Sequence, residues 1–76
     1  MVKIRASYLS RDDVFQLGRL SEQTERAWPG VTVALTELEA DYGQFRMGLV
    51  FMGDDTRQAV TWFRSMMTNV RWYVVS

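Results

Sequence analysis

The sequence predicts a single α+β domain in which a four-stranded antiparallel sheet carries two helices on one of its faces. Three observations point to this class. Four stretches alternate apolar and polar residues with a period of two, as half-buried strands do, and two stretches place apolar residues at helical spacing. The chain has 76 residues, 47% of them hydrophobic and 24% charged, which is enough for one small core.

The first third of the chain predicts a strand and then a helix. The stretch 2–9 alternates, and its apolar side consists of Val2, Ile4, Ala6 and Tyr8. Ser10 stands three residues before Asp13, as in a capping box, so a helix is expected to begin there and run to about Ala27. Its apolar stripe comprises Val14, Leu17, Leu20, Thr24 and Trp28. Pro29 ends this helix because proline cannot continue the hydrogen-bond ladder.

The middle of the chain predicts a β-hairpin. One strand begins at residue 31 and places Val31, Val33 and Leu35 on its apolar side. A second strand over 44–52 does the same with Phe45, Met47, Leu49 and Phe51. The segment 39–43 is expected to connect them, with Gly43 supplying a positive φ.

A second helix and a last strand complete the chain. Asp54 or Asp55 is expected to cap the helix, with Gln58 as the reciprocal partner. The buried stripe of this helix is predicted to contain Ala59, Phe63, Met66 and Met67, bordered by Val60 and Trp62. The helix is expected to end at 68–69, and 70–75 to form the fourth strand.

The order β-α-β-β-α-β resembles the ferredoxin-like, or split β-α-β, fold. Two right-handed β-α-β crossovers joined by a hairpin place both helices on one face of an antiparallel sheet. The resemblance implies that the first and third strands are central and that the second and fourth lie at the edges. It also leaves one face of the sheet without a covering layer.

This open face is predicted to be basic. Because successive residues point to opposite faces of a sheet, the polar positions of each strand define it. Its predicted binding residues are Lys3, Arg5, Arg46, Arg71 and Tyr73, and no acidic residue is expected among them. The same face also contains Val50, Met52 and Val75. It is therefore more apolar than a protein surface without a binding partner usually is. We therefore expect it to bind an acidic partner surface or a second copy of the chain.

Catalysis is not expected. The chain has no His and no Cys, which removes the commonest general base, the thiol nucleophile and the commonest metal ligands. The carboxylate pairs at 12–13 and 54–55 are explained as helix caps and partners of the helix dipole. The acidic stretch 37–41 lacks the spacing of an EF-hand. We therefore expect no catalytic residue, no cofactor and no metal.

Charge and hydropathy bear on partners and location. Nine basic residues balance nine acidic ones, and a net charge of zero argues against wholesale binding to nucleic acid or to a membrane surface. No apolar run approaches the ~20 residues of a membrane span, and residues 1–9 lack the apolar segment of a signal peptide. We expect a cytoplasmic protein with no membrane partner.

Residues 44–51, QFRMGLVF, lie where the RNA-recognition motif carries its third-strand signature, and the order of elements is the same. The resemblance implies a sheet that binds RNA. The positions that stack bases in that family hold Arg46 and Gly48 here, and the first strand offers Lys3 or Arg5 in place of an aromatic residue. Nucleic acid therefore remains an alternative partner only through phosphate contacts with the basic face.

The stretches RMGLVFMGDD and VRWYVV resemble the second half of ACT-like regulatory domains. Such domains bind small effectors, commonly amino acids, at dimer interfaces. The loop 9–13 departs from the Asp-Arg-Pro-Gly type of turn that precedes their first helix, so no effector-binding residue is carried over. Acylphosphatase shares the predicted fold, but the loop after the first strand has no Gly here, so its phosphate cradle is lacking.

The function that we expect is that of a small, non-catalytic protein-interaction module. It would act as a regulator, inhibitor or adaptor, of the kind that a phage or another mobile element encodes. We expect a homodimer, because Trp, Tyr, Met and Arg are enriched at protein interfaces and are numerous here. The alternatives are an ACT-like dimer that senses a small molecule and a protein that binds the nucleic-acid backbone.

Overall fold

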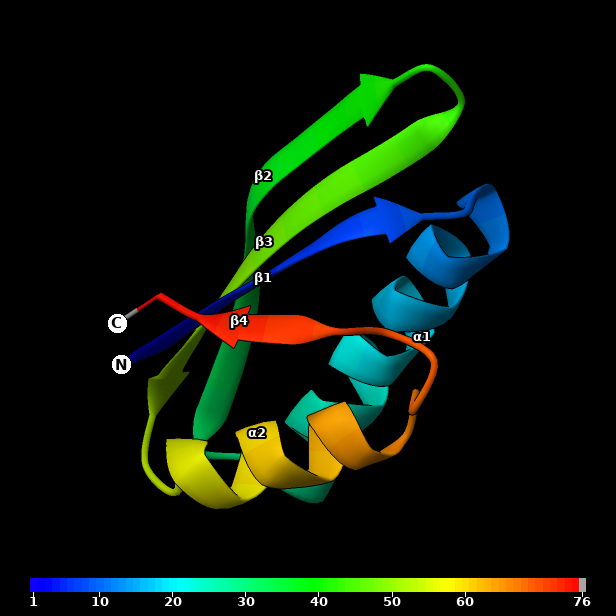
Figure 1. The fold of residues 1–76 in the computed structure, drawn as a ribbon. Coiled ribbons are helices and arrows are strands. Elements are labelled where there is room, and N and C mark those ends of the chain that lie inside the picture. The colour runs from blue at the N-terminus through cyan, green and yellow to red at the C-terminus, as the bar shows by residue number, and fades with distance from the viewer. Residues whose placement is uncertain (76) are drawn as a thin grey trace.

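The computed structural model describes residues 1–75 of the chain. Its elements are β1 (Val2–Leu9), α1 (Arg11–Ala27), β2 (Val31–Asp41), β3 (Gln44–Gly53), α2 (Thr56–Ser65) and β4 (Trp72–Val74). The strands form one antiparallel sheet in the order β2-β3-β1-β4. Both helices lie on the same side of this sheet (Figure 1). The predicted α+β, ferredoxin-like arrangement is confirmed, with β1 and β3 at the centre.

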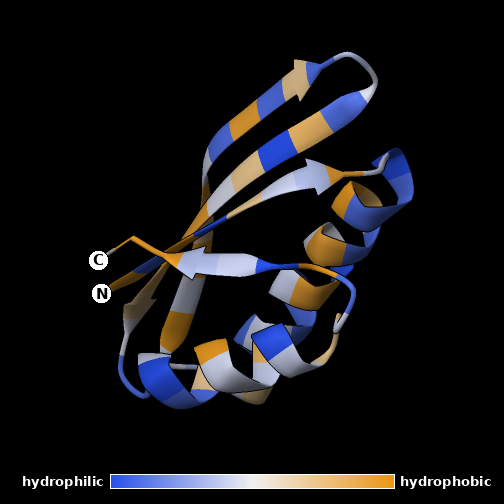
Figure 2. Ribbon diagram, viewed as in Figure 1, coloured by the Kyte–Doolittle hydropathy of each residue, from blue (hydrophilic) through white to orange (hydrophobic). Residues whose placement is uncertain are grey.

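The core lies between the sheet and the two helices, and aromatic rings occupy its centre. Phe63 of α2 meets Phe51 of β3 and Trp72 of β4 edge to face, with ring centroids 5.3 and 5.5 Å apart. Trp28, the C-cap residue of α1, packs against Trp62 of α2, with ring centroids 5.5 Å apart. Figure 2 shows apolar and hydrophilic residues alternating along β2 and β3, as a sheet with one buried face requires.

Helix α1 follows the sequence closely. The Ser10 hydroxyl accepts from the Asp13 amide, and the Asp13 carboxylate accepts from the Ser10 amide, so the predicted capping box is complete. Leu17, Leu20 and Thr24 are buried against the sheet. The helix ends at Ala27, immediately before Trp28 and Pro29. The local sequence therefore determines where this helix begins and where it ends.

Helix α2 departs from expectation at both ends. Asp55 is its N-cap residue but has φ of 59° and makes no side-chain capping bond, so the predicted cap with Gln58 is wrong. The helix ends at Ser65 rather than at 68–69, and Met66 beyond it is 51% exposed instead of buried. Met67 takes the buried place. The left-handed Asp55 lies in the short turn that joins β3 to α2.

A bulge near the end of β1 reverses its alternation. Ala6 pairs with Met47 and Leu9 pairs with Phe45, so β1 uses one residue more than β3 over this stretch. Tyr8 has φ of 59° and its side chain is 83% exposed, whereas Leu9 is buried. The prediction that Tyr8 shares the apolar side of β1 is therefore wrong, because the extra residue moves Leu9 into that position.

A second bulge changes the outer half of β2. Leu35 pairs with Leu49 and Glu37 pairs with Gly48, so Thr36 is the extra residue. Strict alternation would have put Glu37 on the side of Leu35, toward the helices. The bulge places it on the opposite side, and the shift persists to the end of the strand.

The hairpin between β2 and β3 is tighter than expected. β2 continues to Asp41, which pairs with Gln44, so only Tyr42 and Gly43 form the turn. Both have positive φ, 50° and 81°, as a type I′ turn requires. The predicted connection over 39–43 is therefore partly strand, and the hairpin extends beyond the rest of the sheet (Figure 1).

The fourth strand is shorter than expected. It comprises only Trp72–Val74, and Val75 adds one more backbone bond by donating to the Lys3 carbonyl at 2.7 Å. Residues 66–71 form the connection from α2, in which the Val70 amide donates to the Met67 carbonyl. This connection, and not the strand, contains Arg71.

Candidate functional site

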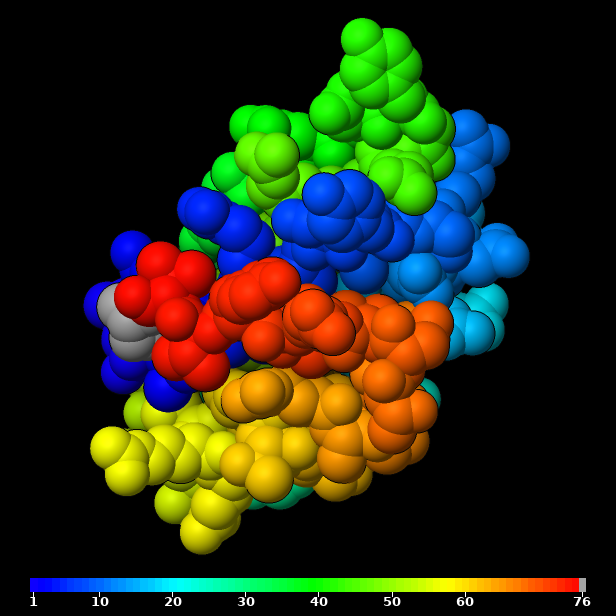
Figure 3. Space-filling view, in the orientation of Figure 1, coloured from blue at the N-terminus to red at the C-terminus, as the bar shows by residue number. Residues whose placement is uncertain are grey.

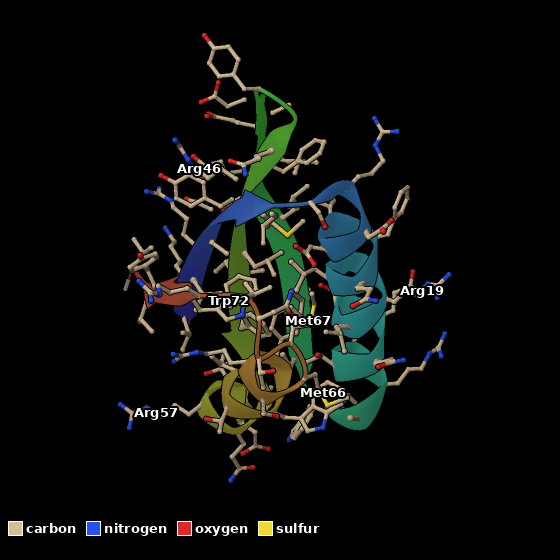
Figure 4. The ribbon with its side chains drawn as sticks, turned by 45° about the vertical axis from the view of Figure 1, so that its right-hand side comes forward. Arg19, Arg46, Arg57, Met66, Met67 and Trp72 are labelled. Carbon is tan, nitrogen blue, oxygen red and sulfur yellow. The ribbon has the colours of Figure 1, made fainter. Side chains whose placement is uncertain are left out.

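The side of the sheet turned away from the helices is called the open face. Alternation and the two bulges place its members, which are Lys3, Arg5, Ser7, Thr32, Ala34, Glu37, Glu39, Asp41, Gln44, Arg46, Gly48, Val50, Met52, Tyr73 and Val75. No helix covers this side, and Figure 4 shows Arg46 on it, across the sheet from α1. Four of the five predicted binding residues lie here.

Arg5 lies at the centre of the open face. It is opposite Tyr73 on β4 and opposite Gly48 on β3. Because Gly48 has no side chain, Arg5 extends across β3 and its Nε lies 3.2 Å from Oε1 of Glu37 on β2. The Glu37 side chain is only 24% exposed, and this oxygen has no aligned hydrogen-bond donor. Arg5 is thus the only counter-charge that this partly buried carboxylate has among the described residues.

Arg46 forms a second ion pair on the same face. It is opposite Glu39, and a guanidinium nitrogen lies 3.5 Å from Oε2 of that residue. Both side chains are about half exposed, so the pair is weak on its own. The prediction that no acidic residue lies on the open face is wrong. The bulge at Thr36 brings Glu37 and Glu39 to the side where Arg5 and Arg46 lie.

The other two predicted binding residues on the open face, Lys3 and Tyr73, are exposed. Lys3 is opposite Val50, and it forms no salt bridge within residues 1–75. Tyr73 is 55% exposed beside Arg5. The open face therefore carries mixed charge: two arginines are paired with two glutamates, and Lys3 and Asp41 add one further charge of each sign.

Arg71 lies outside the four strands, so alternation does not place it on the open face. It lies in the connection before β4 and lines a groove with Arg64 and Asn69. The sequence placed it on the face because the fourth strand was expected to begin at Val70. The loop between α2 and β4 takes up those first residues, so strand alternation does not reach Arg71.

The open face also has an apolar part. Val50 is only 6% exposed although it lies outside the core between sheet and helices. Met52, Tyr73 and Val75 are 36%, 55% and 53% exposed. Side chains of this kind on an uncovered sheet face are typical of a surface that meets another protein.

Gly48 joins the two halves of the open face. An added Cβ would lie 2.7 Å from Oγ1 of Thr36 and 3.3 Å from Cβ of Glu37. We expect Gly48→Ala to lower the free energy of unfolding by about 1–3 kcal/mol, because the methyl group would overpack the bulge. Urea denaturation followed by circular dichroism measures this. Gly30→Ala is the matched control, since its Cβ would meet only Asp54 at ordinary contact distance. Equal stabilities for the two variants would contradict the packing argument.

Within residues 1–75, no three His, Cys, Asp or Glu side chains gather as metal ligands would. Glu37 and Glu39, the carboxylates that share the open face, each contact an arginine. Neither helix in this range is long and apolar enough to cross a membrane. The arrangement offers complementary charge and apolar contact, which are the means of binding.

One surface was missed by reasoning from the sequence. Arg57 and Arg64 lie on α2 and border grooves beside β4, together with Arg71. The signal was present, because arginines seven residues apart share one face of a helix. The alternating pattern of the strands favoured the open face of the sheet as the binding surface instead.

Comparison with known proteins bears on the fold. No protein-family model matches the chain. No curated protein matches its sequence. A solved structure described as "De novo designed protein Foldit4" is similar, with a TM-score of 0.65 and 20% identity, over 96% of this chain and 89% of that chain. At this identity the likeness concerns the arrangement of strands and helices alone, and function has to be argued from the surface of the molecule.

Proposed function

We propose that the protein is a non-catalytic interaction module that pairs with a second copy of itself through the open face. The observation that carries the proposal is the composition of this face, which combines exposed apolar side chains with both signs of charge. A surface with arginines and glutamates side by side can complement itself, because a two-fold axis brings one copy's arginines to the other's glutamates.

Pairing with a second copy fits the charges better than binding to a uniformly acidic surface. Glu37 and Glu39 already neutralise Arg5 and Arg46, and an acidic surface would meet these carboxylates as well. Lys3 and Asp41 add one further charge of each sign, so the face has no excess of positive charge. Like charges brought together at an interface oppose binding, so the glutamates favour a partner that also carries arginines.

The apolar part would supply most of the binding energy. Pairing would bury the exposed surface of Met52, Tyr73 and Val75. Tyrosine and methionine are enriched at protein–protein interfaces compared with the rest of the protein surface. The chain exposes 5194 Å² in all. An ordinary stable interface takes about 800 Å² from each partner, or roughly 15% of this surface, which is the scale of one sheet face.

The non-catalytic part of the proposal rests on the side chains available. The sequence contains no His or Cys, and the carboxylates that share the open face contact arginines. A general acid or base must reach a substrate proton at hydrogen-bond distance. Carboxylates held by arginines on an open sheet are better suited to recognition than to proton transfer.

Self-association through this face is tested with Met52→Ser combined with Tyr73→Ser. We expect sedimentation equilibrium to show a reversible dimer for the parent protein and about tenfold or weaker dimerisation for the double variant, because two central apolar contacts are lost. Tyr42→Ser with Phe15→Ser is the matched control, since both residues are more exposed and lie outside the face. Thermal melts monitor folding of all three proteins.

Two results would contradict the proposal. One is a parent protein that stays monomeric at the highest concentration measured. The other is a dimer that the control pair weakens as much as the open-face pair does, which would place the contact on α1 or the hairpin. A dimer lost only in the open-face variant would support the proposal.

A further inference from the structure

A groove runs between α2 and β4, on a side of the molecule that the open face does not include. Its two adjoining hollows share Thr61. One, of about 680 Å³, lies by the end of α2 and the connection that follows it, and the other, of about 530 Å³, lies by the start of α2 and Val74. Figure 3 shows the seam, with α2 in yellow and orange directly below β4 in red.

The groove carries positive charge that nothing in the described chain offsets. Arg57 borders one hollow, and Arg64 and Arg71 border the other. None of the residues lining either hollow is acidic, and none of these arginines forms a salt bridge within residues 1–75. This contrasts with the open face, where Arg5 and Arg46 are matched by glutamates. The groove is therefore a basic surface that no carboxylate of residues 1–75 offsets.

The arginines are spaced along the groove rather than clustered at one point. Arg57 and Arg64 are seven residues apart on α2, so they share one face of the helix about 10 Å apart along its axis. Thr61 lies between them on the same stripe, and Arg71 approaches from the connection to β4. Carboxylates spread along an extended chain would meet such a row, whereas a single small anion would contact only part of it.

The floor of the groove is apolar. Met67, Val60 and Trp72 are 5%, 6% and 8% exposed, and Val74 at its margin is 58% exposed. The indole nitrogen of Trp72 is buried without a hydrogen-bond partner in the described chain. Apolar contact between the arginines suits side chains such as valine or leucine, which nucleic acid does not offer.

The free edge of β4 adds backbone groups. The Val75 amide donates to the Lys3 carbonyl, so by antiparallel alternation the N–H and C=O groups of Trp72 and Val74 point away from β1. An extended peptide can add to a free edge of this kind and direct alternate side chains into a neighbouring groove. The edge thereby favours a peptide over other acidic partners.

We infer that the groove between α2 and β4 binds an extended peptide segment in which acidic residues alternate with apolar ones. The carboxylates would contact Arg57, Arg64 and Arg71, and the apolar side chains would lie over the groove floor. This interaction is separate from self-association, because pairing through the open face leaves the groove uncovered. A dimer would therefore present two such grooves.

The probe is a short fluorescent peptide that alternates glutamate and valine, with a glutamine-for-glutamate version as its partner. Fluorescence anisotropy should show binding of the glutamate peptide that weakens as salt is raised. Arg57→Gln combined with Arg64→Gln should weaken it about five- to tenfold, the loss of two surface charge pairs. In ¹H–¹⁵N spectra the indole N–H of Trp72 should shift on titration.

The matched control is Arg19→Gln with Arg26→Gln, which removes two exposed arginines with the same spacing from α1. Figure 4 shows Arg19 and Arg57 on opposite sides of the molecule. The control pair should change affinity less than about twofold, as expected for distant surface charges under screening salt. An equal effect of both pairs would overturn the inference, because only net charge would then matter.

Two further results would overturn it. Equal binding of the glutamine peptide would show that the arginines recognise no carboxylate. Displacement of the peptide by oligothymidylate, with the same sensitivity to the α2 variants, would assign the groove to a phosphate backbone instead. Glutamate-dependent binding that is lost in the α2 pair and kept in the α1 pair would support the peptide.

Discussion

Replacing Phe63 with alanine is expected to lower the free energy of unfolding by about 3–5 kcal/mol, the usual cost of removing a buried aromatic side chain. Phe63 is fully buried, and its ring contacts Phe51 on β3 and Trp72 on β4. Phe63 therefore packs α2 against both the central strand β3 and the edge strand β4. A domain of 76 residues has about 4–11 kcal/mol of stability in all, so this loss is a large fraction of it.

Urea denaturation followed by circular dichroism measures the effect. Phe63→Leu should lose less than Phe63→Ala, because leucine refills most of the volume. Phe15→Ala is the exposed control, since the side chain of Phe15 on α1 is 67% exposed, and its stability should stay within about 0.5 kcal/mol of the parent. A similar loss in Phe15→Ala and Phe63→Ala would mean that the ring cluster does not hold the core together.

Gly53→Ala is expected to cost on the order of 3 kcal/mol of unfolding free energy, through backbone strain and a direct clash. Gly53 ends β3 with φ of 107°, a conformation that side chains rarely adopt. An added Cβ would lie 1.9 Å from the carbonyl oxygen of Gly30. That oxygen accepts from the Asp54 amide at 3.2 Å, so it cannot move without breaking the join between the start of β2 and the end of β3.

Gly18→Ala is the natural comparison for Gly53→Ala. Gly18 is exposed in the middle of α1, and nothing lies within 4 Å of an added Cβ. Alanine is the better helix former by about 0.5–1 kcal/mol, so this variant should be more stable than the parent. The same chemical change is thus expected to have opposite signs at the two positions. Thermal melts that rank Gly53→Ala level with the parent would contradict the clash.

Most of the fold follows from local patterns. The capping box at Ser10, the apolar stripe of α1 and its stop before Pro29 were all predicted, and each depends on neighbours within about one helical turn. The order of elements then limits the topology, because right-handed crossovers leave few arrangements. The short end of α2 was missed, since Met66 and Met67 are equally apolar and only tertiary packing buries one of them.

The open face was predicted only in part. Lys3, Arg5, Arg46 and Tyr73 lie where alternation puts them, because no bulge intervenes between them and the centre of the sheet. Tyr8 and Glu37 lie beyond bulges, where one extra residue exchanges the two faces. The resulting ion pairs convert an expected basic face into one of mixed charge. This difference is what shifts the favoured partner from an acidic surface to a second copy.

Periodicity along the chain was sufficient to specify six elements, their order and the side on which the helices lie, because these depend on how consecutive residues divide between water and a core. The bulge at Thr36 depends on a neighbour in another strand, the glycine at 48 that leaves room for it. Which charges meet, and which arginines stay unmatched beside β4, are likewise set by register between distant segments. Contacts of that kind exist only once the strands have paired.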